Sequence, residues 1–106
     1  MSKAMKKLRG SVFSRAGDAC ECCGTFITEE SGRLDHFFGR AKVPESVSNC
    51  WALCLTCDVA KTANEPTAAF WLVAFIAHAR RYGFDAEQAR AEAKLLTLHA
   101  KGLVAA

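Results

Sequence analysis

The sequence lacks the features that would mark a membrane-spanning, secreted or repetitive protein. Its longest apolar run, residues 68–77, is far shorter than the roughly 20 residues that a membrane-spanning helix needs. The start of the chain carries charges but no apolar segment of the kind found in secretory signals, so we expect a cytoplasmic protein. Internal repeats, low-complexity segments and long linkers are also missing. The 106 residues therefore predict one folded domain.

Neither sign of charge is in large excess. The chain has 14 basic and 11 acidic residues, a formal net charge of +3, and this balance identifies no partner. The distribution is more informative, because Asp18 is the first acidic residue and five basic residues precede it: Lys3, Lys6, Lys7, Arg9 and Arg15. Such a basic arm suits a phosphate backbone or another anionic surface, and it is equally typical of a solvated helix.

Cysteine, in contrast, is plentiful. In a cytoplasmic protein, six cysteines indicate metal binding before disulfide formation. Four of them form two pairs with two residues between the partners, namely Cys20 with Cys23 and Cys54 with Cys57. Each pair can direct both thiolates at one centre, and together they supply the tetrahedral four-sulfur set that suits Zn²⁺. Cys22 is an alternative member of the first pair with less suitable spacing, and Cys50 is expected to be a small buried hydrophobe.

Two alternatives to zinc remain open. One is an iron site resembling that of rubredoxin, which has the same four sulfurs but carries glycine after both cysteine pairs and has little helix. Here Gly24 follows the first pair, whereas the second pair runs into "DVAKT", which is typical of a helix start. The other alternative is a reduced cysteine set without metal. The pattern favours structural zinc.

Apolar patterning predicts four helices and a β-hairpin. The expected helices span residues 5–16, 56–61, 68–82 and 86–101, and the expected strands span residues 33–38 and 49–55. Asp85 and Gln88 predict a capping box at the start of the last helix. The helix over residues 68–82 is apolar nearly all round, so either the domain itself or a second subunit, in a homodimer, is expected to cover it.

Three stretches resemble the HNH endonuclease family: "LRGSVFSRAGDACECCG", "LDHFFGRA" and "NCWALCLTCDVAKT". Members of that family show a basic lead-in, a CxxCG pair, an Asp-His pair, a later Asn, and a CxxCH pair followed by Lys. Their order and approximate spacing match here from Leu8 to Thr62, about half of the chain. The resemblance implies an α+β fold whose core is a small zinc-stabilised ββα-metal finger. Residues 1–66 would form this finger with its N-terminal helix, and residues 67–106 a C-terminal helical hairpin.

The resemblance also implies a function and a set of roles. The chain would be a nuclease, a hydrolase that binds DNA and cleaves its phosphodiester bonds. His36 matches the general base, Asp35 a ligand of the catalytic metal, and Asn49 the residue that tethers the loop and orients the histidine. Contacts to nucleic acid would come from four basic residues: Lys61, Arg40, Arg15 and Arg9.

Asp58 departs from the family pattern, which usually has a histidine there as the second metal ligand. An aspartate still coordinates through oxygen. With Asp35 it makes a hard, negative, oxygen-only pair, which suits Mg²⁺ or Mn²⁺ better than metals that prefer imidazole or sulfur. The expected reaction is single-metal hydrolysis of a phosphodiester.

The same residues also have structural interpretations. Asp35 can cap a turn, His36 can be a histidine with a purely structural hydrogen bond, and Asp58 can cap the helix that follows the second cysteine pair. A degenerate finger that binds nucleic acid or a protein partner without cleaving would have this sequence too.

Overall fold

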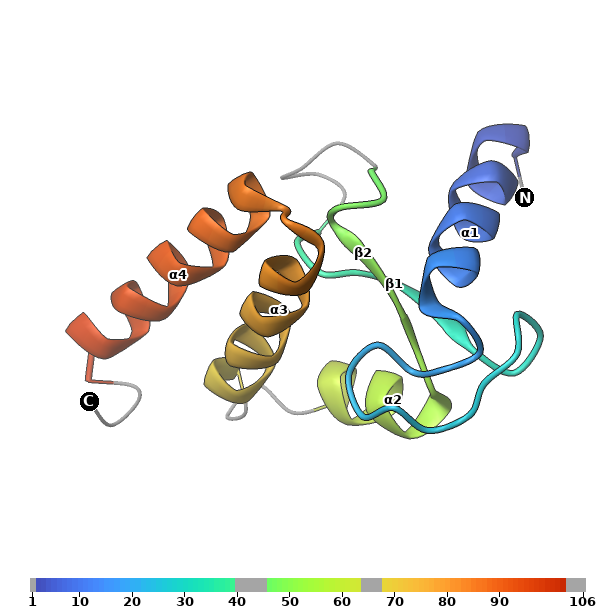
Figure 1. Ribbon diagram of the computed structural model, residues 1–106. Helices are drawn as coiled ribbons and strands as arrows, with labels where there is room; N and C mark the ends of the chain where they lie inside the picture. The colour runs from blue at the N-terminus through green and yellow to red at the C-terminus, as the bar shows by residue number, and fades with distance from the viewer. Residues whose placement is uncertain (1, 40–45, 64–67, 103–106) are drawn as a thin grey trace. The chain divides into compact units, whose positions relative to one another are not determined.

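The computed structural model describes residues 2–39, 46–63 and 68–102 (Figure 1). In that part of the chain it contains four helices and one two-stranded antiparallel sheet. The elements in order are α1 (Lys3–Ala16), β1 (Arg33–His36), β2 (Cys50–Leu53), α2 (Leu55–Ala63), α3 (Ala68–Tyr82) and α4 (Asp85–Ala100). The expected α+β class is therefore confirmed. No helix among the described residues has both the length and the apolar character needed to cross a bilayer.

The chain divides into two compact units, Met1–Ala60 and Lys61–Ala106. The sequence predicted a division after residue 66, whereas the division in the structure lies inside α2. The first unit holds α1, the hairpin and most of α2. The second holds the pair of helices α3 and α4.

In the first unit, the hairpin is the centre of the packing. β1 and β2 pair side by side (Figure 1). They run antiparallel, with Asp35 opposite Trp51 and His36 opposite Cys50. All four residues of β2 are fully buried, and α1 packs against this strand. Both strands are shorter than predicted. β1 ends at His36 because the chain bends at Phe37 and Phe38, and β2 ends at Leu53 because α2 begins at Leu55. The bend follows directly on the Asp-His pair.

Helix α1 begins and ends with local signals that the sequence carries. The Ser2 hydroxyl accepts a hydrogen bond from the Met5 backbone N–H at 3.1 Å, an N-cap that extends the helix two residues beyond the predicted start. Gly17 ends it in the left-handed conformation, at φ 60°. On the helix surface, the Arg9 guanidinium lies over the Phe13 ring, 4.5 Å from its centroid.

In the second unit, α3 supplies most of the buried surface. Its buried residues are Trp71, Leu72, Phe75, Ile76, His78 and Ala79. Phe70 and Val73 on the same helix are 60% and 56% exposed. The helix that is apolar nearly all round thus buries much of its surface and leaves a smaller apolar face in contact with solvent.

The predicted capping box at the start of α4 is wrong. Phe84 occupies the N-cap position and makes no side-chain cap bond, and Asp85 lies inside the first turn. The aromatic contacts of Phe84 explain the difference: its ring stacks on Tyr82, with centroids 5.6 Å apart, and Gly83 turns the chain at φ 74°. Asp85 still places a negative charge at the helix N-terminus, where the helix dipole favours it.

Candidate metal centre

The four paired cysteines come together in the first unit. The sulfur atoms of Cys20, Cys23, Cys54 and Cys57 all lie within 4.8 Å of one another. The Cys23 and Cys54 sulfurs are 3.8 Å apart. In a tetrahedral site with zinc–sulfur bonds of about 2.3 Å, the edge between two sulfurs is also about 3.8 Å. The group can therefore hold a zinc ion without rearrangement of this pair.

Tight turns at the two pairs create this geometry. In the first pair, Gly24 donates a backbone hydrogen bond to the Cys20 carbonyl at 2.9 Å, and its φ of 81° requires glycine. The second pair lies where β2 passes into α2, with Cys57 in the first turn of the helix. In each pair the second cysteine directs its backbone N–H at the first sulfur, at 3.5 Å for Cys20 and 3.4 Å for Cys54.

The thiols of the group differ in acidity. Burial raises the pKa of Cys20, but backbone N–H groups that point at its sulfur, that of Cys23 foremost, outweigh burial and lower the pKa to about 7. Burial and the neighbouring thiols raise the pKa of Cys57. Because thiolates are the metal-binding form, binding releases protons from the group and weakens as the pH falls.

The two remaining cysteines are outside the group. Cys22 is half-buried beside it, and its pKa is raised by burial and by the charge of Cys20. Cys50 is fully buried in β2, as expected of a small hydrophobe. The structure thus selects Cys20 and Cys23, not Cys22, for the first pair.

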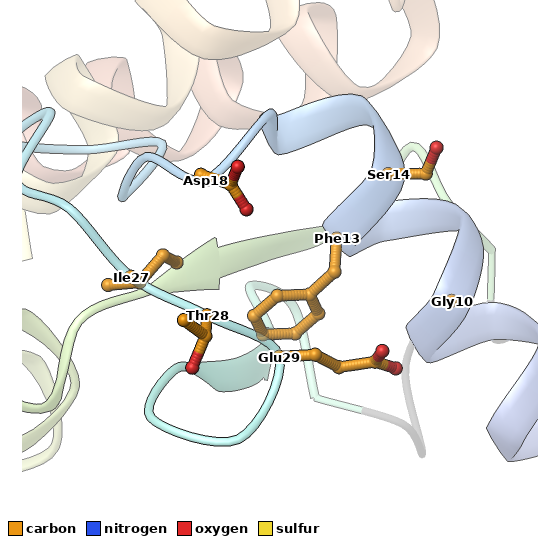
Figure 2. Close-up of a pocket in the computed structure, with 7 residues that line it drawn as sticks. All are labelled: Gly10, Phe13, Ser14, Asp18, Ile27, Thr28 and Glu29. Atoms are coloured by element: carbon orange, nitrogen blue, oxygen red, sulfur yellow. The ribbon is translucent and has the colours of Figure 1, made fainter.

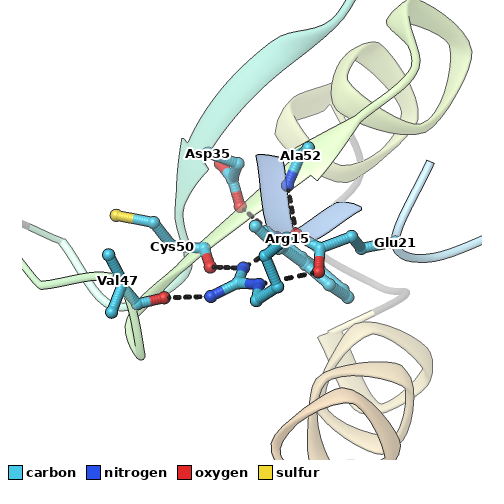
Figure 3. Close-up of polar contacts among 7 residues, drawn as sticks. Arg15, Glu21, Asp35, Val47, Cys50 and Ala52 are labelled. Atoms are coloured by element: carbon cyan, nitrogen blue, oxygen red, sulfur yellow. Dashed lines mark hydrogen bonds and ion pairs between the residues drawn. The ribbon is translucent and has the colours of Figure 1, made fainter. Parts of the chain in front are cut away.

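A buried ion pair ties the first cysteine pair to α1 and β2 (Figure 3). The Arg15 guanidinium donates to both carboxylate oxygens of Glu21, at 3.0 and 2.8 Å, and also to the carbonyls of Val47 and Cys50, each at 2.7 Å. The Glu21 side chain is 1% exposed and accepts a further bond from the Ala52 N–H at 2.9 Å. Glu21 was not identified from the sequence. The one sequence feature that could have indicated its role is an acidic residue between the two cysteines of the first pair.

This network gives Arg15 an architectural function. Its guanidinium bonds within the unit, and its side chain is 14% exposed. Arg9 is also engaged, since it donates to the carbonyls of Glu29 and Gly32. Contacts from either arginine to nucleic acid stay predictions. Arg40 lies outside the described residues.

Asn49 joins the two ends of the hairpin connection. Its side chain is fully buried, accepts from the Phe38 N–H at 3.0 Å and donates to the Phe38 carbonyl at 2.9 Å. Its own carbonyl accepts from the Phe37 N–H at 2.8 Å. Asn49 therefore pins the bend that follows β1 to the residue that precedes β2.

The other predicted site residues lie on the hairpin and on α2. Asp35 is half-buried and accepts a hydrogen bond from the Trp51 indole at 2.8 Å. His36, the last residue of β1, is half-buried with its Nε2 atom buried. Asp58 is half-buried in the first turn of α2, and Lys61 follows one turn later. Among the described residues, the four cysteines are the one group of three or more potential ligands within bonding range of a common ion.

A separate pocket of about 250 Å³ lies between α1 and the loop before β1 (Figure 2). Apolar and polar side chains share its lining, which consists of Gly10, Phe13, Ser14, Asp18, Ile27, Thr28 and Glu29. It includes none of the cysteines and none of the predicted catalytic residues.

Comparisons of this chain with models of protein families, with curated proteins and with solved structures give no match.

Zinc binding should depend on Cys23 and not on its neighbour Cys22. We expect one zinc per chain. Zinc should be retained in Cys22→Ser and lost or bound much more weakly in Cys23→Ser, because Cys23 belongs to the four-sulfur group and Cys22 does not. Metal analysis after dialysis checks the stoichiometry, and circular dichroism during chelation should report loss of structure in the first unit. Equal zinc content in the two variants would exclude this ligand set.

Removing the charge of Glu21 should destabilise the fold. Glu21→Gln leaves the buried Arg15 without its counter-ion, so we expect the free energy of unfolding to fall by about 3 kcal/mol. Glu29→Gln is the matched control, because it affects the exposed Arg9–Glu29 pair and should cost less than about 1 kcal/mol. Urea denaturation of the zinc-loaded protein measures both, and equal losses would contradict the assigned role.

Proposed function

We propose that this chain is a metal-dependent endonuclease of the HNH type that hydrolyses DNA phosphodiester bonds. The supporting observation is the succession β1–β2–α2, with Asp35 and His36 at the end of β1 and Asp58 in the first turn of α2. That is the order of a ββα-metal finger, and the four cysteines connect the ends of the hairpin unit.

His36 is the proposed general base. Histidine takes up and releases protons near neutral pH, which suits removal of a proton from the attacking water. Adjacent residues of a strand point to opposite faces, so Asp35 and His36 serve one site only if the backbone turns there. The bend begins immediately after His36, at Phe37 and Phe38, so the proposal requires the end of β1 to turn with it when substrate binds. Because Nε2 is buried, Nδ1 is the nitrogen proposed to accept the proton.

Asp35 and Asp58 are the proposed ligands of a divalent cation. Both residues are half-buried. Two oxygen ligands suit Mg²⁺ or Mn²⁺, and Mg²⁺ usually keeps several waters with only one or two protein carboxylates. Once bound, the cation supplies charge stabilisation for the departing oxygen.

The phosphate backbone is proposed to contact the lysines of α1. Lys3, Lys6 and Lys7 are exposed, and their spacing places them on one helix face. No acidic residue lies in the first turn of α1. Arg9 and Arg15 bond within the unit, so these lysines are the better candidates for the basic arm's contacts.

A second candidate function is a zinc-stabilised module that binds nucleic acid or a protein partner without cleavage. The aspartate at position 58, where the family usually has histidine, favours it. The exposed Phe70 and Val73 of α3 favour a partner surface, including a homodimer through residues 68–82. A solution mass measurement distinguishes monomer from dimer.

A plasmid-nicking assay with Mg²⁺ or Mn²⁺ tests the nuclease directly. Loss of a general base typically lowers a rate by about 10²- to 10⁴-fold, and we expect His36→Ala to fall in that range. His99→Ala is the matched control, since it removes an exposed histidine on α4 and should leave the rate unchanged.

Undiminished cleavage in His36→Ala would overturn the assigned mechanism. If the parent protein does not cleave and Asp58→His does, the second candidate function replaces the first.

The lysine face predicts a specific salt dependence. Each phosphate contact on duplex DNA contributes about 0.9 to the slope of log affinity against log salt. Replacing Lys3, Lys6 and Lys7 with glutamine in the His36→Ala background should therefore lower the slope by up to about 3. A variant with Lys94 and Lys101 replaced by glutamine is the control, because both are exposed but belong to the second unit. Identical slopes in the two variants would exclude the lysine face.

A further inference from the structure

The carboxylate of Asp35 is held by a side chain from the opposite strand. Asp35 and Trp51 are directly paired in the hairpin register, so their side chains lie on the same face of the sheet. The Trp51 indole Nε1 donates to Asp35 Oδ2 at 2.8 Å. This is a short, cross-strand hydrogen bond to a residue that the proposed function places at the cation.

Trp51 is itself fixed in position. It is fully buried, and its ring meets Phe37 edge-on, with centroids 5.7 Å apart and planes at 82°. Phe37 meets Phe38 in the same way, at 5.1 Å and 87°. A tryptophan side chain packed on this scale has little freedom to move, so the N–H points at a constant place.

A second carboxylate, that of Glu21 in the turn after α1, bonds to the same hairpin but has a contrasting set of partners. Glu21 receives two bonds from the cationic Arg15 and one from the Ala52 N–H, and its charge is cancelled in the interior. The indole N–H is a neutral donor. It fixes the direction of the Asp35 carboxylate and adds no positive charge of its own.

We infer that Trp51 is a positioning residue that holds the Asp35 carboxylate in place to bind a divalent cation. The inference rests on the proposed function for the role of Asp35. Hydrogen bonds from surrounding groups commonly fix metal-binding carboxylates, and loss of one typically costs 10- to 100-fold in metal affinity or activity. The competing explanation is that Asp35 serves only to satisfy the buried indole N–H.

Mn²⁺ binding, measured without nucleic acid, separates these explanations. Trp71→Phe leaves Trp51 as the single tryptophan, since the chain has two. Titration of Mn²⁺ into this zinc-loaded variant should quench Trp51 fluorescence in a saturable way. Asp35→Asn keeps an oxygen that can accept the indole bond but loses the charge, so the quenching should disappear. Persistent or absent quenching in both proteins would overturn the inference.

The bond itself is tested with Trp51→Phe, which keeps an aromatic ring and removes the N–H. We expect its Mn²⁺ affinity, measured from the electron paramagnetic resonance of the free ion, to fall by about 10- to 100-fold. In the Asp35→Asn background the same change should have no further effect, because the two residues act through one interaction. Unchanged affinity in Trp51→Phe would overturn the inference, and if that variant does not fold, the fluorescence titration decides.

The two proposals fail in different ways. Mn²⁺ binding that depends on Asp35 and Trp51, in a protein that never cleaves DNA, removes the nuclease and keeps the positioning role. Cleavage that requires His36 but is unaffected by Trp51→Phe removes the positioning role of Trp51 and keeps the nuclease.

Discussion

The first unit brings four sulfur atoms together from two distant parts of the chain, at a place where a metal ion could cross-link them. The turn after α1 contributes Cys20 and Cys23, and the junction of β2 with α2 contributes the other two sulfurs. A hairpin with four-residue strands is marginally stable alone, so its register requires support from outside. The Arg15–Glu21 ion pair reinforces the same junction, because Glu21 lies between Cys20 and Cys22 and bonds to β2. A metal ion bound by the four sulfurs would therefore stabilise the same junction as the ion pair.

Much of this arrangement could be predicted because it is encoded locally. Cysteine spacing identifies the four sulfurs that come together, and the sequence pattern locates all four helices within a few residues. The hairpin was predicted from its aromatic and apolar residues, although its strands end earlier than expected. The bend at Phe37 and Phe38 depends on the buried Asn49, which lies about ten residues away in the chain. The residue pattern of β1 alone does not predict the hydrogen bonds between the Asn49 side chain and the Phe38 backbone.

What the sequence could not predict are the partners of polar groups. Arg15 belonged to a basic arm by position, and only the folded chain brings it to Glu21. The pairing of Trp51 with Asp35 follows from the hairpin register, and one residue of slip would put the two side chains on opposite faces. The start of α4 is a further case, since aromatic contacts of Phe84 displace Asp85 from the cap. Local rules fail where tertiary contacts select between acceptable alternatives.

The four sulfurs do not share the same surroundings. Cys20 and Cys54 are buried, Cys57 is half-buried, and Cys23 is exposed. Ligand exchange at such a centre has a direction: chelators and oxidants would reach it through Cys23, because that sulfur is exposed and the other three are buried or half-buried. Loss of the Cys23 ligand alone would leave three sulfurs on the metal, and β2 would stay joined to the turn after α1. The first stage of metal loss therefore need not unfold the unit.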